Sequence, residues 1–186
     1  MTVKDLAKPD IFFFKTRQTK FRRKTEGATM TRSKSYEHET DVSAPQLWAI
    51  YGTLRAAELV PEVLPHIFTK TEVVSGDGGV GTVVQMTFSQ GGTFTEKFVK
   101  VDNENYIKEA LGIDGDILNA GFLYYMIRLE IIDKGPDSSV IRSTVEYDFD
   151  DGHPELEAMA STTLLAAVAA EFVKYVKEHK TPEASS

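Results

Sequence analysis

The 186-residue chain contains no cysteine. This absence excludes disulfide bonds, a thiolate nucleophile, cysteine-based zinc fingers and iron–sulfur clusters, and it is typical of a protein in a reducing, intracellular compartment. Histidine is scarce: the four residues show neither i,i+4 pairing nor a carboxylate at metal-ligand spacing. The sequence therefore predicts no metal and no cofactor.

Long apolar runs are missing as well. The densest stretches, Ile11 to Phe14 and Leu164 to Ala170, are far shorter than the roughly 20 residues that cross a bilayer. The N-terminal region lacks the long apolar segment and small-residue cleavage site of a secretory signal. We therefore expect neither a membrane-spanning segment nor secretion.

Basic residues are few outside the N-terminal region. Residues 1–34 contain ten Lys/Arg against three Asp/Glu, a net charge of +7, whereas the remainder contains eleven basic and twenty-five acidic residues, a net charge of −14. An acidic body does not attract the phosphate backbone of nucleic acids. The charge distribution therefore disfavours a nucleic-acid partner.

Three regions follow from this composition. We expect residues 1–34 to be a basic, disordered extension, residues 35–180 to be the folded domain, and residues 181–186 to be a polar tail. Two alternatives for the extension are an organellar presequence and a chain that properly begins at Met30. Without such a presequence, the expected location is the cytoplasm, with the nucleus as an alternative.

The domain is predicted to begin with a strand and two short helices. Residues alternate in polarity from Ser35 to Val42, as in a strand with one face in water. Ser43 and Pro45 form a helix-start signal, and Pro61 and Pro65 end the second helix. Short connections then separate further strands, which favours antiparallel pairing. These strands are Thr69–Val74, Thr82–Phe88, Thr93–Val101, Tyr106–Asp114, Phe122–Ile132 and Ser139–Phe149.

The last predicted element is one long helix from Pro154 to about Lys180, with no Pro or Gly in its interior. Its apolar stripe needs a cover, and the concave face of a curved sheet is the available one. Alanines on the helix favour either close packing or a void that could hold a ligand. The expected stripe comprises Leu156, Met159, Thr163, Ala166, Ala167, Ala170 and Val173.

The segment Gly76 to Gly81 satisfies the pattern G-x-G-x-x-G. That pattern binds a pyrophosphate only where a helix N-terminus follows, and here a β-rich segment from Thr82 to Phe88 follows instead. We interpret the glycines as a hairpin that requires positive φ angles, rather than as a nucleotide site.

Four segments together resemble the plant birch-pollen-allergen superfamily, which comprises the pathogenesis-related class ten and major latex proteins. The resemblance is strongest to its norcoclaurine synthase-like branch and extends over about residues 35–180. It implies an α+β helix-grip fold, in which a seven-stranded antiparallel sheet and two short helices surround a long C-terminal helix and a hydrophobic cavity. The segments are Gly76–Thr82, Glu96–Phe98 with Val101–Glu104, Tyr124–Met126 and Val140–Tyr147.

Within the predicted hairpin, one register pairs Glu96 with Lys108 and Phe98 with Tyr106. This register is favoured over a two-residue turn at Asp102-Asn103, which pairs Glu96 with Glu109 and so opposes like charges. A carboxylate and an ammonium on an inward, aromatic face are either a mutually satisfied ion pair or a working acid and base.

The resemblance places Glu96 and Lys108 on the two catalytic positions of norcoclaurine synthases, which condense a phenethylamine with an aryl acetaldehyde. It implies that Lys108 activates the carbonyl and assists iminium formation, and that Glu96 accepts the proton lost from the ring. Seven further residues are expected to line the ligand cavity: Phe94, Phe98, Tyr125, Ile127, His38, Met86 and Leu164.

Two positions depart from the family pattern, because the synthases carry a tyrosine in place of Phe94 and an aspartate in place of Ile127. We expect weaker orientation of a dopamine-like amine and retention of related condensation or imine chemistry. The alternative is a noncatalytic carrier of hydrophobic ligands, or an abscisic-acid-type receptor in defence signalling with a protein phosphatase as partner. A ribonuclease function has little support from an acidic domain.

Overall fold

The computed structural model describes residues 31–179. The extension expected for residues 1–34 therefore lies largely outside the described residues, as does the expected polar tail. The first strand begins at Arg32, three residues before the expected start at Ser35, so the end of the basic segment belongs to the sheet.

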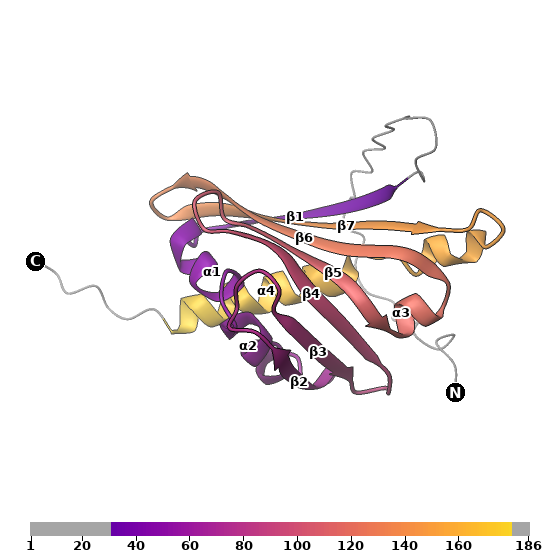
Figure 1. Cartoon of the computed structure of the whole chain (residues 1–186). Helices are drawn as coiled ribbons and strands as arrows, with labels where there is room; N and C mark the ends of the chain where they lie inside the picture. The colour runs from indigo at the N-terminus through magenta and orange to yellow at the C-terminus, as the bar shows by residue number, and fades with distance from the viewer. Residues whose placement is uncertain (1–30, 180–186) are drawn as a thin grey trace, which may run out of the picture.

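Seven strands form one antiparallel sheet in the order β1-β7-β6-β5-β4-β3-β2. This sheet curves around the C-terminal helix, as Figure 1 shows, and confirms the predicted α+β helix-grip fold. The strands are β1 (Arg32–Thr40), β2 (Phe68–Ser75), β3 (Val83–Phe88), β4 (Thr93–Asp102), β5 (Ile107–Gly115), β6 (Phe122–Gly135) and β7 (Ser138–Phe149).

The two predicted short helices are α1 (Ala44–Tyr51) and α2 (Arg55–Val63). At the start of α1, the Gln46 side-chain oxygen accepts hydrogen bonds from the backbone nitrogen and the hydroxyl of Ser43, at 3.3 and 2.8 Å. Pro61 does not end α2 but lies inside it. A third short helix, α3 (Asp116–Asn119), was not predicted and follows Gly115, whose φ of 114° favours glycine.

The prediction of one continuous C-terminal helix was wrong. The segment consists of a 3₁₀ helix, η2 (Pro154–Ala158), and a separate α-helix, α4 (Thr163–Glu178). Between them, the Ser161 hydroxyl accepts a hydrogen bond from the backbone nitrogen of Thr163 at 3.1 Å. Serine and threonine side chains that bond to nearby backbone compete with the helical pattern, which explains the break.

The face that α4 buries matches the predicted stripe only in part. Thr163 and Ala170 of that stripe are exposed, and Val173 is buried as predicted. Ala169 and Phe172, which were not predicted, are buried as well. The stretch Pro154–Glu178 is long and apolar enough to cross a membrane by length and composition alone. In the fold, however, α4 packs against α1, α2, β1 and β7.

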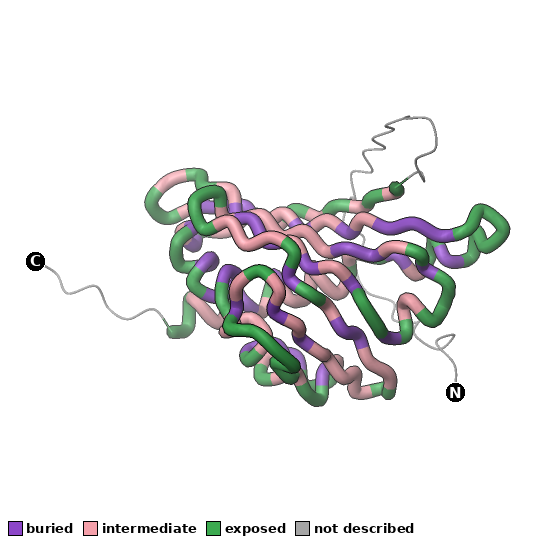
Figure 2. Tube along the Cα trace, in the orientation of Figure 1, coloured by how far each residue is buried: buried purple, intermediate pink, exposed green. Residues whose placement is uncertain are grey.

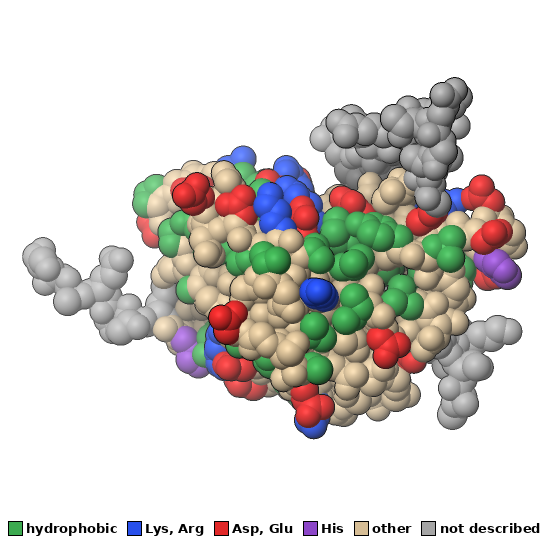
Figure 3. Space-filling view, viewed as in Figure 1, with side chains coloured by type: hydrophobic (Ala, Val, Ile, Leu, Met, Phe, Trp, Pro, Cys, Tyr) green, Lys and Arg blue, Asp and Glu red, His purple; other side chains and the backbone are tan. Residues whose placement is uncertain are grey.

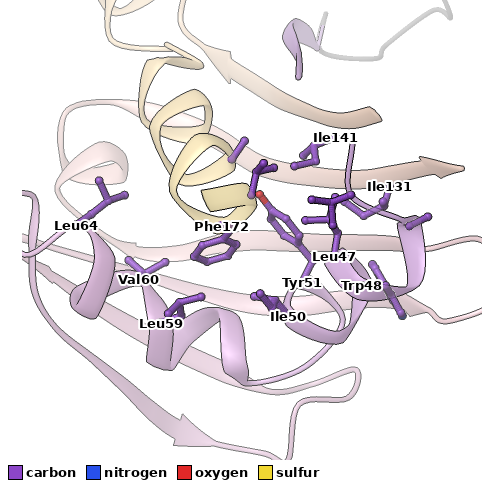
Figure 4. Packing of buried hydrophobic residues seen from close by; sticks show 14 of the residues in the cluster. Leu47, Trp48, Ile50, Tyr51, Leu59, Val60, Leu64, Ile131, Ile141 and Phe172 are labelled. Carbon is purple, nitrogen blue, oxygen red and sulfur yellow. The ribbon is translucent and has the colours of Figure 1, made fainter. Parts of the chain in front are cut away.

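Buried residues occur along the strands and on α1, α2 and α4 (Figure 2). The largest cluster lies where α1, α2 and α4 meet the sheet, and Figure 4 shows Phe172 of α4 packed among residues of α1 and α2. A second, aromatic cluster lies at the opposite end of the sheet and includes Phe94, Phe122 and Tyr125. A small third cluster contains Val84, Phe98 and Ala110.

The glycine-rich segment is a connection between β2 and β3, as predicted. Gly76 and Gly78 have φ angles of 96° and 102°, which favour glycine. The Thr82 hydroxyl accepts a hydrogen bond from the backbone nitrogen of Gly78 at 2.9 Å. Because β3 follows this turn instead of a helix, no helix N-terminus is available to a pyrophosphate here.

Candidate active site

Glu96 and Lys108 lie on neighbouring strands, but the predicted register was wrong. Glu96 is opposite Gly112, and Lys108 is opposite Val101. Register shifts between Thr95 and Glu96 and between Phe98 and Lys100 displace the two strands relative to a regular hairpin. Such irregularities insert unpaired residues that alternation in the sequence does not reveal.

Lys108 is buried, with 4% of its surface exposed. Its Nζ donates a hydrogen bond to the backbone oxygen of Tyr51, at the end of α1, over 3.2 Å. The same nitrogen lies 3.6 Å from the centroid of the Phe98 ring, so the negative face of that ring contacts the ammonium group. A helix end and an aromatic ring thus hold the lysine inside the domain.

Glu96 lies on the inward face of β4 between Phe94 and Phe98 and is half-buried. Within residues 31–179, its carboxylate has no hydrogen bond and no ion pair within 4.0 Å. The interpretation of Glu96 and Lys108 as a closed structural ion pair is therefore not supported. The carboxylate keeps its lone pairs free to accept a proton.

The electrostatic environment changes the pKa of both groups. Burial raises the pKa of the Glu96 carboxyl above its usual range, and the Lys108 ammonium offsets part of that change. Burial lowers the pKa of Lys108 below its usual range, and the Glu96 charge again offsets part of it. Both pKa values are thereby shifted toward neutral pH, the range in which a general base and a general acid are most effective.

The other predicted site residues also face the interior. Phe94 and Tyr125 meet edge to face with their ring centroids 5.9 Å apart, and Met86 and Ile127 pack against the same aromatic cluster. The ring of Phe98 contacts the ammonium group of Lys108. Leu164 packs against the largest cluster. The predicted lining residues are thus distributed over three hydrophobic clusters.

His38 is half-buried on the inward face of β1. Its Nδ1 lies 3.2 Å from the hydroxyl of Tyr36. Burial lowers the pKa of the imidazole, and the positive charge of Lys177 adds to that effect. His38 therefore favours its neutral form and borders the interior as a hydrogen-bonding group.

Several inward-facing side chains are only half-buried, among them Tyr36, His38, Met86, Ile127, Leu129 and Leu164. Each of these side chains keeps part of its surface accessible. Two surface depressions, of about 550 and 480 Å³, lie elsewhere. The first is bordered by the α1–α2 connection and the β2–β3 turn, and the second by the β4–β5 turn and the end of β6.

The sequence interpretation missed two interior residues, Tyr51 and Ser143. The Tyr51 backbone oxygen accepts the hydrogen bond from Lys108, and among residues 31–179 its own hydroxyl has no hydrogen-bond partner. The Ser143 hydroxyl is likewise buried without a partner. The alternation of β7 could have placed Ser143 on the inward face, but no pattern indicates that a hydroxyl is unpaired.

The opposite face of the sheet has a different character. Figure 3 shows hydrophobic side chains gathered on this outer surface around an isolated basic residue. Exposed Val99, Ile113 and Leu123 belong to β4, β5 and β6.

Among residues 31–179, no group of three or more His, Cys, Asp or Glu side chains is arranged to hold a metal ion.

The sequence is similar to plant alkaloid-forming synthases. Norbelladine synthase of Narcissus pseudonarcissus is 47% identical over 137 residues, which cover 72% of this chain and 84% of the relative. S-norcoclaurine synthase of Thalictrum flavum subsp. glaucum is 39% identical over 160 residues, covering 82% of this chain and 74% of the relative.

Comparison of the fold with solved structures identifies the same group of synthases. A structure of Thalictrum flavum norcoclaurine synthase with a transition-state analogue matches with a TM-score of 0.76 and 37% identity, covering 84% of this chain and all of that one. Another structure of this enzyme, with dopamine and hydroxybenzaldehyde, matches with a TM-score of 0.75 and 36% identity. The match covers 88% of this chain and 99% of that one. The profile of the pathogenesis-related protein Bet v 1 family matches residues 29–179. The chain belongs to this family.

Proposed function

We propose that this protein binds small aromatic substrates between α4 and the concave face of the sheet and condenses a phenethylamine with an aldehyde. The observation that carries the proposal is the interior Glu96 carboxylate, which has no hydrogen-bond or ion-pair partner among residues 31–179 and lies near the buried ammonium of Lys108. An unpaired interior carboxylate is costly to maintain, and working acid–base groups are a common reason for such a cost.

The proposed reaction begins when the amine nitrogen attacks the aldehyde carbon. Lys108 donates a hydrogen bond to the carbonyl oxygen and stabilises the negative charge that develops there. The hydroxyl of the resulting carbinolamine takes a proton from Lys108 and leaves as water, which yields an iminium ion. An aromatic carbon of the amine substrate then bonds to the iminium carbon. The hydrogen on that aromatic carbon leaves as a proton, which Glu96 accepts.

The relatives support this reaction class. They are named norcoclaurine and norbelladine synthases, and one solved norcoclaurine synthase contains an amine, dopamine, together with hydroxybenzaldehyde. Phe94 and Ile127 give this interior an apolar lining at two positions where the synthases carry polar groups. We therefore propose condensation, including a reaction that stops at the imine, without assigning norcoclaurine as the product.

A carrier function is the second candidate, favoured by the apolar character of Phe94 and Ile127 within the aromatic cluster. A carrier needs the interior space but neither the carboxylate nor the ammonium. Replacement of Glu96 or Lys108 then leaves ligand affinity nearly unchanged and removes no reaction, because none is catalysed.

The test is turnover of phenethylamines with aryl aldehydes by the full chain, with chiral analysis of any ring-closed product and direct detection of the imine. We expect an enzyme-dependent product that Glu96→Gln and Lys108→Met each reduce by about 100-fold or more. The matched controls are Glu104→Gln and Lys97→Met, since both residues are exposed. A racemic product at the uncatalysed rate, with saturable aldehyde binding, contradicts the enzyme and supports the carrier.

A further inference from the structure

The outer face of the sheet, opposite the proposed site, has an apolar patch (Figure 3). Along one row of this face, Lys97 on β4 lies between Val83 on β3 and Leu111 on β5. Leu111 in turn lies opposite Met126 on β6. Alternate residues of a strand share a face, so residues two positions along β5 and β6 extend the same surface. We define the outer patch as Val83, Leu111, Ile113, Tyr124 and Met126.

Lys97 lies at the centre of the outer patch. Its side chain is exposed and has no hydrogen bond or ion pair among residues 31–179. By contrast, Arg128 and Arg142 on the same face are each paired with glutamates. An apolar surface with one cation available for pairing is complementary to a segment that combines large apolar side chains with one carboxylate.

The N-terminal part of the sequence contains such a segment. Asp10 is followed directly by Ile11, Phe12, Phe13 and Phe14, so a carboxylate begins one of the two densest apolar runs of the chain. Six basic residues follow between positions 15 and 24. Residues 1–30 lie outside the described part of the structure. By sequence, Asp10–Phe14 has both properties that the outer patch requires of an occupant.

The chain enters the sheet on the same row as the outer patch. Ser33 of β1 lies opposite Glu146 of β7, and Glu146 lies opposite Met126. Since neighbouring strands are about 4.8 Å apart, Lys97 on β4 is about 19 Å from Ser33. The 18 residues from Lys15 to Arg32 span up to about 60 Å when extended. Asp10–Phe14 can therefore reach the outer patch of its own chain.

Glu146 lies between Ser33 and the outer patch. Its carboxylate has no hydrogen-bond or ion-pair partner in the part of the chain that the structure describes. The basic residues between positions 15 and 24 have to pass this carboxylate if Asp10 reaches Lys97. A second copy of the chain is a poorer occupant, because a two-fold contact through the centre of the patch sets Lys97 against its counterpart.

We propose that Asp10–Phe14 docks on the outer patch of its own chain. The segment runs from β4 toward β1, with the Asp10 carboxylate on the Lys97 ammonium and the four apolar side chains over Leu111 and Met126. The basic residues that follow then pass Glu146 on the way to β1. Docking removes apolar surface of both the segment and the sheet from water. This inference concerns the opposite face of the sheet and does not depend on the proposed condensation.

The test is disulfide trapping in the full chain, which has no cysteine of its own. Phe12→Cys is combined with Ile113→Cys in the outer patch, or with Glu130→Cys as the matched control. From strand spacing and residue rise, both partner positions are about 16 Å from Ser33 on the outer face, but Glu130 lies outside the patch. Each rate is divided by the rate at which a small free disulfide modifies the same partner cysteine.

At low protein concentration, we expect the intramolecular disulfide to form about tenfold faster with Ile113→Cys than with Glu130→Cys, because docking raises the effective concentration of the thiol. In the Ile113→Cys protein, Lys97→Glu lowers the rate to that of the control, and further addition of Asp10→Lys restores it. Thermal melting checks that each variant folds.

Equal rates for the two cysteine pairs overturn the proposal. A Lys97→Glu protein that keeps the original rate, or that Asp10→Lys does not rescue, contradicts the pairing of Asp10 with Lys97 and overturns it as well. Disulfide-linked dimers in place of the intramolecular product show that the outer patch binds a second copy and exclude docking within one chain. Because no substrate is present, none of these outcomes depends on turnover.

Discussion

The ammonium nitrogen of Lys108 lies 3.6 Å from the centroid of the Phe98 ring. Within the described residues, this ring and the Tyr51 backbone oxygen are the partners that compensate the buried charge at short range. Burial nevertheless lowers the pKa of Lys108. The Phe98 ring therefore helps to keep the lysine protonated, and protonated lysine is the form that can activate a carbonyl.

Phe98→Leu removes this contact while keeping an apolar side chain of similar size. We expect the pKa of Lys108 to fall further, because the ammonium loses a cation–π interaction of about 1–2 kcal/mol. The alkaline limb of the pH–rate profile then moves to lower pH by about one unit. Phe68→Leu is the control, since Phe68 is also buried and packs on an aromatic ring, that of Phe88, without contacting the lysine. An equal shift in both variants contradicts a specific role for Phe98.

Glu96 links folding stability to pH. Because its folded-state pKa is raised, its contribution to stability is fully present below the pKa of the unfolded chain, about 4.3, and is lost as pH rises through the folded-state value. Glu96→Gln avoids that loss. We expect the melting temperature of the variant, relative to wild type, to increase as pH rises from acid to mildly alkaline. A difference in melting temperature that stays constant across this pH range contradicts a raised pKa of the Glu96 carboxyl.

Ser139 and Ser143 allow a comparison of paired and unpaired hydroxyls on one strand. Ser139→Ala leaves the backbone oxygen of Val42 without its donor and is expected to cost about 1 kcal/mol in the free energy of unfolding. Ser143→Ala removes a hydroxyl that has no hydrogen-bond partner in the part of the chain that the structure describes, so we expect no loss or a gain of up to about 1 kcal/mol. Urea denaturation measures both. A larger loss for Ser143→Ala shows that its hydroxyl has a structural partner.

Gly112 faces Glu96 across the β4–β5 pair. A Cβ atom at this position meets the Phe94 ring at 2.9 Å and the backbone oxygen of Tyr125 at 3.2 Å. Gly112→Ala is therefore expected to displace the Phe94 ring, to destabilise the fold by about 1–3 kcal/mol and to reduce turnover. Gly79→Ala is the control, because its nearest neighbour is the flexible side chain of Asp77 at 3.3 Å. Equal stability of the two variants contradicts close packing at Gly112.

The order of elements could be predicted from the sequence because it rests on local signals. The alternation of β1, the Ser43 and Pro45 start of α1, and the short connections between later strands are all properties of adjacent residues. The positions of Glu96 and Lys108 on two neighbouring inward faces followed from the same alternation. These features require no knowledge of distant contacts.

The errors arose where the outcome depends on irregular backbone or on distant partners. Bulges in β4 changed the pairing of Glu96, and the Ser161 turn divided the C-terminal helix. The hydrogen bond from Lys108 to Tyr51 joins residues 57 positions apart. No periodicity encodes such a contact, so the way in which the lysine is held became evident only in three dimensions.

The most direct measurement is the pH dependence of kcat/KM for the amine–aldehyde condensation, in wild type and in Glu96→Gln. We expect the wild-type rate to fall in acid at a pH above the usual range of a carboxyl group, because burial raises the pKa of Glu96. The residual rate of Glu96→Gln is expected to lack this acid limb. A variant that keeps the wild-type rate and the same acid limb contradicts the role of Glu96 as the base.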